Sequence, residues 1–168
     1  MDGVTSPAKG FRSGFACFVG RPNVGKSTLM NALVGTKVAI TSAKPQTTRR
    51  AIRGIVHRSD AQLVIVDTPG LHRPRTLLGE RLDSLVLSTL TEVDVIAFCV
   101  PVNERVGKGD RFIAQKLAAV RETPVIAVVT KCDLGTREEI AKQLLAVSKL
   151  GDFAEIVPVS AVSGEQLG

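Results

Sequence analysis

Gly20-Arg-Pro-Asn-Val-Gly-Lys-Ser27 is the stretch of sequence that decides the fold, because it fits the pattern G-x-x-x-x-G-K-[ST]. Its glycines let the backbone turn N–H groups inward around phosphate groups. Lys26 adds a positive charge for the β- and γ-phosphates, and Ser27 adds a hydroxyl ligand for Mg²⁺. The residues expected to contact a nucleotide here are Asn23, Val24, Gly25, Lys26, Ser27 and Thr28.

The segments on either side of this loop are the ones that the motif requires. An apolar run over residues 15–19 predicts a buried strand, and residues 27–34 have the spacing of a helix. A chance glycine loop would rarely lie between a strand and a helix, so a phosphate-binding loop is favoured. The positive end of the helix then points at the same anion.

The rest of the chain alternates between short apolar runs and helical patterns. Further strands are expected over residues 51–57, 62–66, 95–100, 125–129 and 156–159. Further helices are expected over 77–90, 110–120 and 136–149, the last with a capping box of Thr136 and Glu139. This order predicts an α/β fold of the P-loop NTPase type: a mainly parallel sheet flanked by helices on both faces. Ligands of such sheets bind at the carboxyl ends of the strands.

Length and composition bound the possible functions. The 168 residues suit one domain, and the net charge of +6 favours anionic partners such as nucleotides, RNA or acidic lipid. A solvated surface with an excess of basic residues is an equal alternative on charge alone. Aromatic residues make up only 4% of the chain, which argues against a stacking platform for single-stranded nucleic acid.

The cysteines and the apolar runs bear on where in the cell the protein is located, and the N-terminal residues have a composition of their own. Cys17, Cys99 and Cys132 lie in or beside apolar runs, so reduced buried thiols and a cytoplasmic location are expected. No apolar stretch approaches the roughly 18 residues of a membrane span. Residues 1–14 are rich in Gly, Ser and Pro, and we expect a disordered tail there.

Two further segments carry residues for a metal ion and for hydrolysis. Asp67-Thr-Pro-Gly70 follows an apolar run, so Asp67 can hold Mg²⁺ through a water and the Gly70 N–H can meet a γ-phosphate. The same four residues would also make an ordinary turn, but the phosphate loop favours the metal interpretation. Thr48 is expected to ligate Mg²⁺ from the loop over residues 36–50, with Thr47 as the alternative. Lys26, Thr48 and Gly70 are therefore the expected catalytic residues.

Two loops are expected to recognise the base. Asp133, in Thr130-Lys131-Cys132-Asp133, can accept hydrogen bonds from guanine N1–H and the 2-amino group, neither of which adenine offers. This argues against an ATPase. The remaining residues expected to bind the nucleotide are Thr130 and Lys131 before this carboxylate, and Ser160, Ala161 and Val162 after the last strand.

These motifs in this order resemble the translation-factor-related GTPases, and most closely the Era family. The resemblance runs from about Phe15 to the end of the chain, and its most specific stretch is Ile40-Thr-Ser-Ala-Lys-Pro-Gln-Thr-Thr-Arg-Arg50. It implies a Ras-like G domain that binds GTP or GDP with Mg²⁺ and hydrolyses GTP to GDP and phosphate. It also implies a molecular switch in small ribosomal subunit assembly and 16S rRNA maturation.

Era-like proteins carry a KH domain after the GTPase domain, and this domain binds the 3′ end of the small-subunit rRNA. The chain stops at Gly168, so we expect a G domain over residues 15–168 without its last helix and without the KH domain. The small ribosomal subunit and 16S rRNA are then partners through that absent domain. We expect this chain alone to be monomeric, with a peripheral contact at the inner face of the cell membrane as a further expectation.

The chain departs from related GTPases at two positions. Thr130 stands where the family usually has Asn, which should lower nucleotide affinity while Asp133 keeps the guanine preference. Leu71 stands where Ras-like proteins have a water-orienting Gln, a substitution that the Era family shares. By resemblance, Asn23 can ligate a K⁺ ion that acts in place of an arginine finger.

A rival hypothesis is an RNA-binding module. Its contact residues would be Arg49, Arg50, Arg53, His57 and Arg58. They span a predicted loop and a predicted strand, so they need not share one face of the protein.

Overall fold

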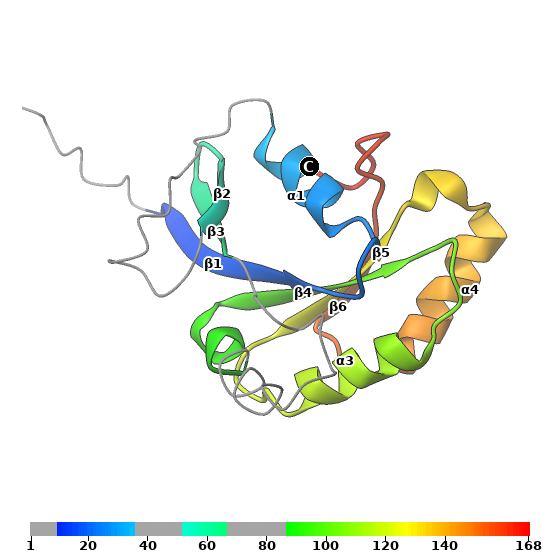
Figure 1. Ribbon diagram of the computed structural model, residues 1–168. Helices are drawn as coiled ribbons and strands as arrows, with labels where there is room; N and C mark the ends of the chain where they lie inside the picture. The colour runs from blue at the N-terminus through cyan, green and yellow to red at the C-terminus, as the bar shows by residue number, and fades with distance from the viewer. Residues whose placement is uncertain (1–9, 36–51, 67–86) are drawn as a thin grey trace, which may run out of the picture.

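The computed structural model describes residues 10–35, 52–66 and 87–168. Within these residues, six strands form one sheet in the order β2-β3-β1-β4-β5-β6. Their bounds are β1 Arg12–Val19, β2 Ile52–His57, β3 Ala61–Val66, β4 Val95–Pro101, β5 Val125–Thr130 and β6 Glu155–Pro158. β2 and β3 pair antiparallel, and the other neighbours pair parallel (Figure 1). The prediction of a mainly parallel sheet is therefore confirmed.

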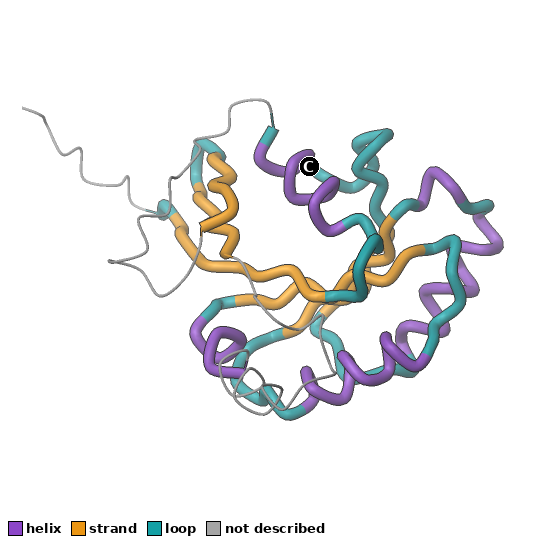
Figure 2. Tube along the Cα trace, in the orientation of Figure 1, coloured by secondary structure: helices purple, strands orange, loops and turns teal. Residues whose placement is uncertain are grey.

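Helices cover both faces of this sheet, as the alternating sequence pattern predicts. α1 (Lys26–Val34) lies on one face, and α3 (Lys108–Ala118) and α4 (Arg137–Ser148) lie on the other (Figure 2). A short 3₁₀ turn, η1 (Cys132–Leu134), follows β5 and has no counterpart among the predicted elements. Residues 87–92 are helical, and the rest of the helix predicted over 77–90 lies outside the described residues.

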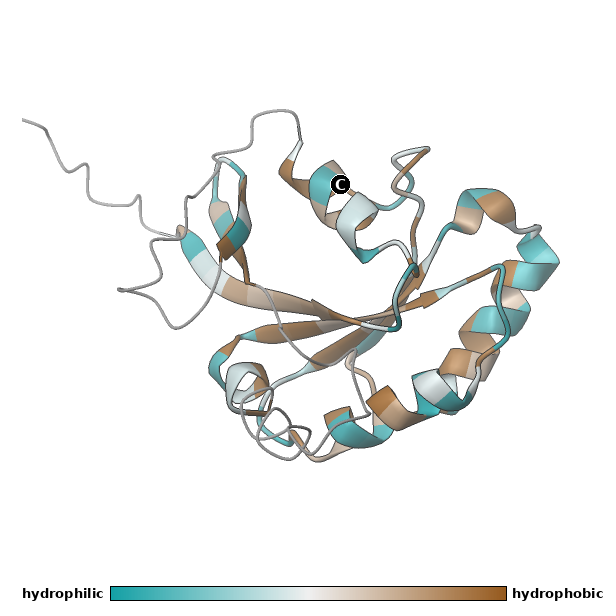
Figure 3. Ribbon diagram, viewed as in Figure 1, coloured by the Kyte–Doolittle hydropathy of each residue, from teal (hydrophilic) through white to brown (hydrophobic). Residues whose placement is uncertain are grey.

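Alternate side chains of the central strands enter two different cores. On β4, Ile96, Phe98 and Val100 join the cluster under α3 and α4, whereas Ala97 and Cys99 join the cluster under α1. A parallel sheet with helices on both faces buries both sides of its strands, which explains their nearly continuous apolar runs (Figure 3). All three cysteines are buried as free thiols, as predicted. Within the described residues, no helix is long and apolar enough to cross a membrane.

β1 begins at Arg12, three residues before the predicted start. Its first residues pair with β3, in the register Arg12↔Ala61 to Gly14↔Leu63. Burial is low at these positions, so hydropathy alone could not reveal the strand. The last part of the predicted tail, residues 12–14, is therefore strand and that part of the prediction is wrong. The predicted tail over 1–9 lies outside the described residues.

The parallel strands bring the functional motifs to one edge. β1, β4, β5 and β6 run in the same direction, so their carboxyl ends meet there. The predicted phosphate loop (residues 20–27) follows β1, the turn predicted to read the base (residues 130–133, called the base-reading turn) lies at the end of β5, and the last loop follows β6 (Figure 1). The fold thus places segments more than 100 residues apart in sequence at one site.

α4 shows how local sequence stabilises the scaffold around this edge. The backbone N–H of Glu139 donates to Thr136 Oγ1 at 3.2 Å, and the Thr136 N–H donates to Glu139 Oε2 at 2.8 Å. The capping box predicted from the sequence is confirmed.

We expect Thr136→Ala to lower the free energy of unfolding by about 1 kcal/mol, because an N–H at the helix start loses its acceptor. Urea denaturation would measure the change. Gln115→Ala, on the exposed side of α3, is the control and should stay within about 0.5 kcal/mol of the unchanged protein. Equal stability of the Thr136→Ala protein and the unchanged protein would contradict the role of the cap.

Candidate functional site

The phosphate loop depends on the glycine at its start. Gly20 has φ +155°, and a Cβ there would lie 2.6 Å from the backbone oxygen of Cys99. Only glycine therefore lets the loop leave β1 this close to β4. Asn23 and Gly25 also have positive φ, at 62° and 94°. The loop thus has the tightly turned backbone that the motif predicts.

Lys26 lies over this loop and is half-buried. Its Nζ donates hydrogen bonds to the backbone oxygens of Gly20 at 2.5 Å and Arg21 at 2.8 Å. Desolvation is the main cause that lowers the pKa of Lys26, and the nearby Arg21 charge lowers it further. An anion bound in the loop would favour the charged form of the lysine and offset this penalty. The lysine is therefore suited to bind phosphate.

A pocket of about 350 Å³ lies above the loop, lined by Asn23, Gly25, Lys26, Ser27, Thr28 and Lys131. α1 begins here with neither a side-chain cap nor an acidic residue in its first turn. Its N-terminal N–H groups and its positive end therefore suit an anion. Of the six residues expected to contact a nucleotide at this loop, Val24 alone does not line the pocket, because its side chain is buried in the core.

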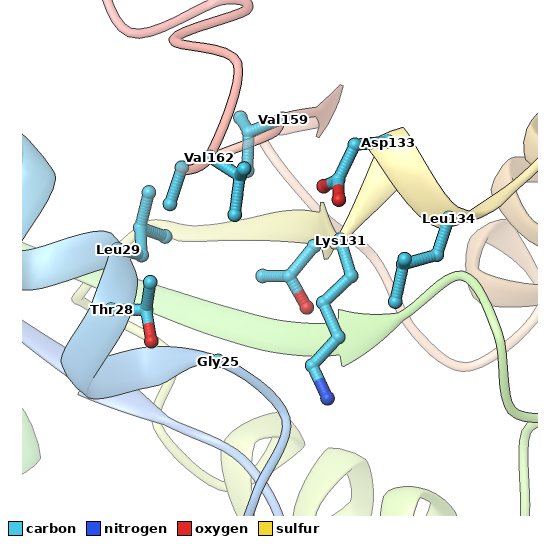
Figure 4. A pocket seen from close by; sticks show the side chains of 10 residues that line it. Gly25, Thr28, Leu29, Lys131, Asp133, Leu134, Val159 and Val162 are labelled. Atoms are coloured by element: carbon cyan, nitrogen blue, oxygen red, sulfur yellow. The ribbon is translucent and has the colours of Figure 1, made fainter.

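A second pocket, of about 250 Å³, adjoins the first through Gly25, Thr28 and Lys131. Its remaining walls are mainly apolar: Leu29 from α1, Leu134 from η1, and Val159, Ala161 and Val162 after β6. Figure 4 shows the carboxylate of Asp133 directed into the space between these side chains. The pair of pockets therefore suits a flat, mostly apolar group with polar edges, linked to an anion.

Asp133 is oriented by the loop after β6. Ser160 Oγ donates to Asp133 Oδ1 at 2.7 Å, and the Ser163 N–H donates to Ser160 Oγ at 3.1 Å. Ser160 is fully buried, so this arrangement is fixed by the surrounding structure. An ionised carboxylate only accepts hydrogen bonds, and it therefore selects a ligand edge that carries donors.

The base-reading turn is bound directly to the phosphate loop. Thr130 Oγ1 donates to the backbone oxygen of Val24 at 2.5 Å, and Lys131 Nζ donates to the backbone oxygen of Asn23 at 2.8 Å. Lys131 has φ 60°, a left-handed conformation that is uncommon outside glycine. The Thr130 hydroxyl thus contacts the phosphate loop from the position at which the Era family usually has the side-chain amide of Asn.

The structure brings the predicted phosphate and base residues together, but the residues predicted for Mg²⁺ and hydrolysis are described only in part. Ser27 lines the phosphate pocket. Thr48, Asp67 and Gly70 lie outside the described residues, as do Thr47 and Leu71. Their roles therefore stay predictions.

The residues of the rival RNA patch are also only partly described. Arg53 and His57 are exposed on β2, and the Arg58 side chain donates to the backbone oxygen of Leu167 at 3.1 Å. Arg49 and Arg50 lie outside the described residues. Of the described residues of this patch, Arg58 therefore makes a contact within the protein, to the C-terminal segment.

Sequence reasoning missed several residues of the site. Leu29, Leu134 and Val159 line the second pocket, the one in which a base is expected. In the sequence these three residues look like ordinary core residues. Arg21, inside the phosphate motif, pairs with Asp110, which is 89 positions away. No local pattern could have revealed that pairing.

Comparisons with known proteins agree with this geometry. The family model for the 50S ribosome-binding GTPases matches residues 15–131. GTPase Era from Streptomyces coelicolor is 64% identical over 161 residues, which is 93% of this chain and 51% of that protein. An Era variant from Aquifex aeolicus bound to GDP and AlF4⁻ matches with a TM-score of 0.69 at 37% identity, over 90% of this chain and 52% of that one.

A second solved structure adds RNA to the comparison. Era in complex with MgGDPNP and nucleotides 1506–1542 of 16S ribosomal RNA matches with a TM-score of 0.72 at 37% identity. The match covers 92% of this chain and 53% of that one. The chain therefore spans about half the length of the relatives it matches.

We expect Thr130→Val to lower the free energy of unfolding by about 1–3 kcal/mol, because the buried oxygen of Val24 loses the hydroxyl donor. The substitution keeps the shape of the side chain, and chemical denaturation without added ligand would measure the effect. Thr28→Val, at an exposed position on α1, is the matched control. Equal losses for the two variants would show that the bond to Val24 contributes nothing.

Proposed function

Because the chain belongs to the 50S ribosome-binding GTPase family, we propose that it is the guanine-nucleotide-binding part of a GTP-hydrolysing switch of the Era type. The single observation that carries this proposal is the placement of Asp133. Its carboxylate points into an apolar pocket that adjoins the phosphate pocket. A guanine base and its phosphates require both features side by side.

In this proposal the phosphates lie in the loop over residues 20–27. Lys26, whose ammonium has three donors, would donate to the β- and γ-phosphate oxygens and keep its bond to the Arg21 carbonyl. The start of α1 would donate N–H groups to the same anion. Thr28, at the junction of the two pockets, would lie near the phosphates closest to the sugar. The phosphate groups are thus held largely by backbone N–H groups and one lysine.

The guanine base would occupy the pocket at the ends of β5 and β6. Asp133 would accept from N1–H and the 2-amino group, while the Ala161 N–H would donate to O6. The stem of Lys131 would lie against one face of the base, and Val162, which is 79% exposed, would be covered on binding. Ser160 contributes indirectly, by orienting the carboxylate.

Mg²⁺ fits the donor set proposed for it, because hydroxyl and carboxylate oxygens are the ligands it prefers. Ser27 would hold it together with Thr48 and Asp67, and when bound it neutralises charge on the phosphoryl oxygens. Gly70 would donate its N–H to the γ-phosphate. The loops that carry Thr48 and Gly70 would then respond to loss of that phosphate, which is the basis of a switch.

The partners proposed for the full-length protein follow from its relatives. One Era structure contains a segment of 16S rRNA, so we propose a role in small ribosomal subunit assembly and 16S rRNA maturation. RNA binding would lie in a KH domain like that of Era proteins, outside the span matched here. We also propose that this chain is monomeric and that its net charge of +6 favours a peripheral contact with acidic lipid.

We also propose that K⁺ assists hydrolysis at Asn23. The backbone oxygen of Asn23 is held by Lys131, and the residue lines the phosphate pocket. An amide oxygen at this position can ligate a monovalent cation next to the phosphates. Such a cation would supply the positive charge that an arginine finger gives in other GTPases.

We expect GTP hydrolysis by this chain to be slow and to run about tenfold or more faster in K⁺ than in Na⁺, because an added positive charge stabilises the transition state. Phosphate release at matched ionic strength would measure the two rates. Asn23→Ala should remove the difference between the salts. Equal rates in both salts for the unmodified chain would refute the K⁺ proposal and leave nucleotide binding unaffected.

The guanine assignment is tested by Asp133→Asn. The new NH₂ group would face the guanine 2-amino group, leaving two donors opposed in a buried place, whereas xanthine offers a carbonyl there. Each mismatch costs about 1–3 kcal/mol, so the preference should move from GTP towards xanthosine triphosphate by about tenfold or more.

Competition of the two nucleotides for the unmodified and Asp133→Asn chains measures this preference. Asp152→Asn, at an exposed position, is the control for loss of one negative charge. If the Asp133→Asn chain keeps the original preference, Asp133 does not recognise the base.

A further inference from the structure

Arg21, the second residue of the phosphate motif, is bound to two carboxylates of a distant segment. Its Nε donates to Asp110 Oδ1 at 2.8 Å, and its Nη2 lies 3.0 Å from Glu104 Oε2. The hydrogen bond to Asp110 is the main cause that raises the pKa of Arg21. Asp110 has 0% of its surface exposed, so its charge needs a fixed partner. Arg21 is that partner, and its side chain is held in place.

Asp110 is in turn fixed to the start of α3. The N–H of Gly107 donates to Asp110 Oδ2 at 2.9 Å, which closes the first turn of the helix. One oxygen of Asp110 thus caps α3 and the other binds the phosphate loop. Gly109 leaves the space that this requires, because a Cβ there would lie 2.7 Å from Arg21 Cδ.

The backbone of Arg21 continues this chain of contacts to Lys26. The Arg21 carbonyl accepts a hydrogen bond from Lys26 Nζ at 2.8 Å, beside the bond that Gly20 accepts. Because the Arg21 side chain is fixed, the Arg21 carbonyl is also held in place, and this carbonyl orients Lys26. A continuous path of contacts joins the start of α3 to the lysine of the phosphate loop.

We propose that Asp110 and Arg21 are a positioning pair, through which α3 holds the phosphate loop in the shape that presents Lys26 to the β-phosphate. The inference rests on the proposed nucleotide function and adds to it Asp110, a residue from outside the phosphate and base motifs. Asp110 acts through Arg21 and touches no nucleotide.

For the Asp110→Asn variant, the positioning pair and simple electrostatics predict opposite changes in GDP affinity. Asp110→Asn removes a negative charge near the phosphates, which by electrostatics alone would strengthen GDP binding. The positioning pair predicts that GDP binding weakens by about tenfold, because the charge-assisted bond that orders Arg21 is lost. Binding of GMP, which lacks the β-phosphate that Lys26 contacts, should change by less than about twofold.

Competition against a fluorescent GDP would measure both affinities in the full chain. The variants are Asp110→Asn, Arg21→Gln and the double variant, which pairs two neutral amides and leaves no buried charge unpartnered. Because the two residues act as one pair, the double variant should bind GDP no more weakly than Arg21→Gln alone. The charge-matched controls are Asp152→Asn, at an exposed position before β6, and Arg111→Gln, at an exposed position on α3.

Gly109→Ala tests the same path without removing a charge. Alanine favours helix more than glycine does, so the substitution should not destabilise α3 by itself. Its Cβ would displace the Arg21 side chain, and we expect weaker GDP binding with GMP binding unchanged. Thermal melting without nucleotide separates this effect from loss of folding.

Three results would overturn the inference while leaving the proposed function intact. They are unchanged or stronger GDP binding by Asp110→Asn, equal losses for GDP and GMP, and additive losses in the double variant. In each case the unmodified chain still binds GDP, and Lys26→Ala still weakens that binding. Failure of the unmodified chain to bind any guanine nucleotide would instead refute the proposed function, and this inference with it.

Discussion

The hydrogen bond from the Thr130 hydroxyl to the carbonyl of Val24 is the contact on which the rest of the site depends. It joins the end of β5 to the phosphate loop in a buried place, where an unpaired carbonyl would be costly. Because Asp133 follows Thr130 by three residues, the base pocket keeps a fixed distance from the phosphate loop. In the proposed complex, a single nucleotide would therefore reach both parts of the site without rearrangement of the sheet.

In the proposed complex, the two pockets would divide the binding energy between different physical effects. The pocket proposed for the base has mostly apolar walls, so covering it on binding would remove apolar surface from water, while one oriented carboxylate would supply the specificity. The pocket proposed for the phosphates includes Lys26 and the start of α1, and it would act through charge. Ser160 would link base recognition to the scaffold, because its buried hydroxyl orients Asp133.

Buried charge explains why the loop and α3 are joined. Asp110, in the first turn of α3, has no exposed surface, and a buried carboxylate persists only with a partner. Arg21 supplies that partner from the phosphate motif itself. The arginine of the motif thus has a structural role that is independent of phosphate contact, and the loop gains a second anchor in addition to the one that Thr130 provides.

The sequence by itself determined the order of the elements, the position of the phosphate loop and the choice of Asp133 as the residue expected to recognise the base. Each of these depends on residues that are close together in the chain. Apolar runs, glycine spacing and the capping box of α4 are local signals of this kind. The first residues of β1 were missed because their pairing with β3 is long-range and their side chains are exposed. Only the tertiary structure decided that Thr130 binds Val24, that Ser160 orients Asp133 and that Arg21 pairs with Asp110. These contacts join residues 27 to 106 positions apart, and no periodicity in a sequence records which distant segments a sheet brings to the same edge.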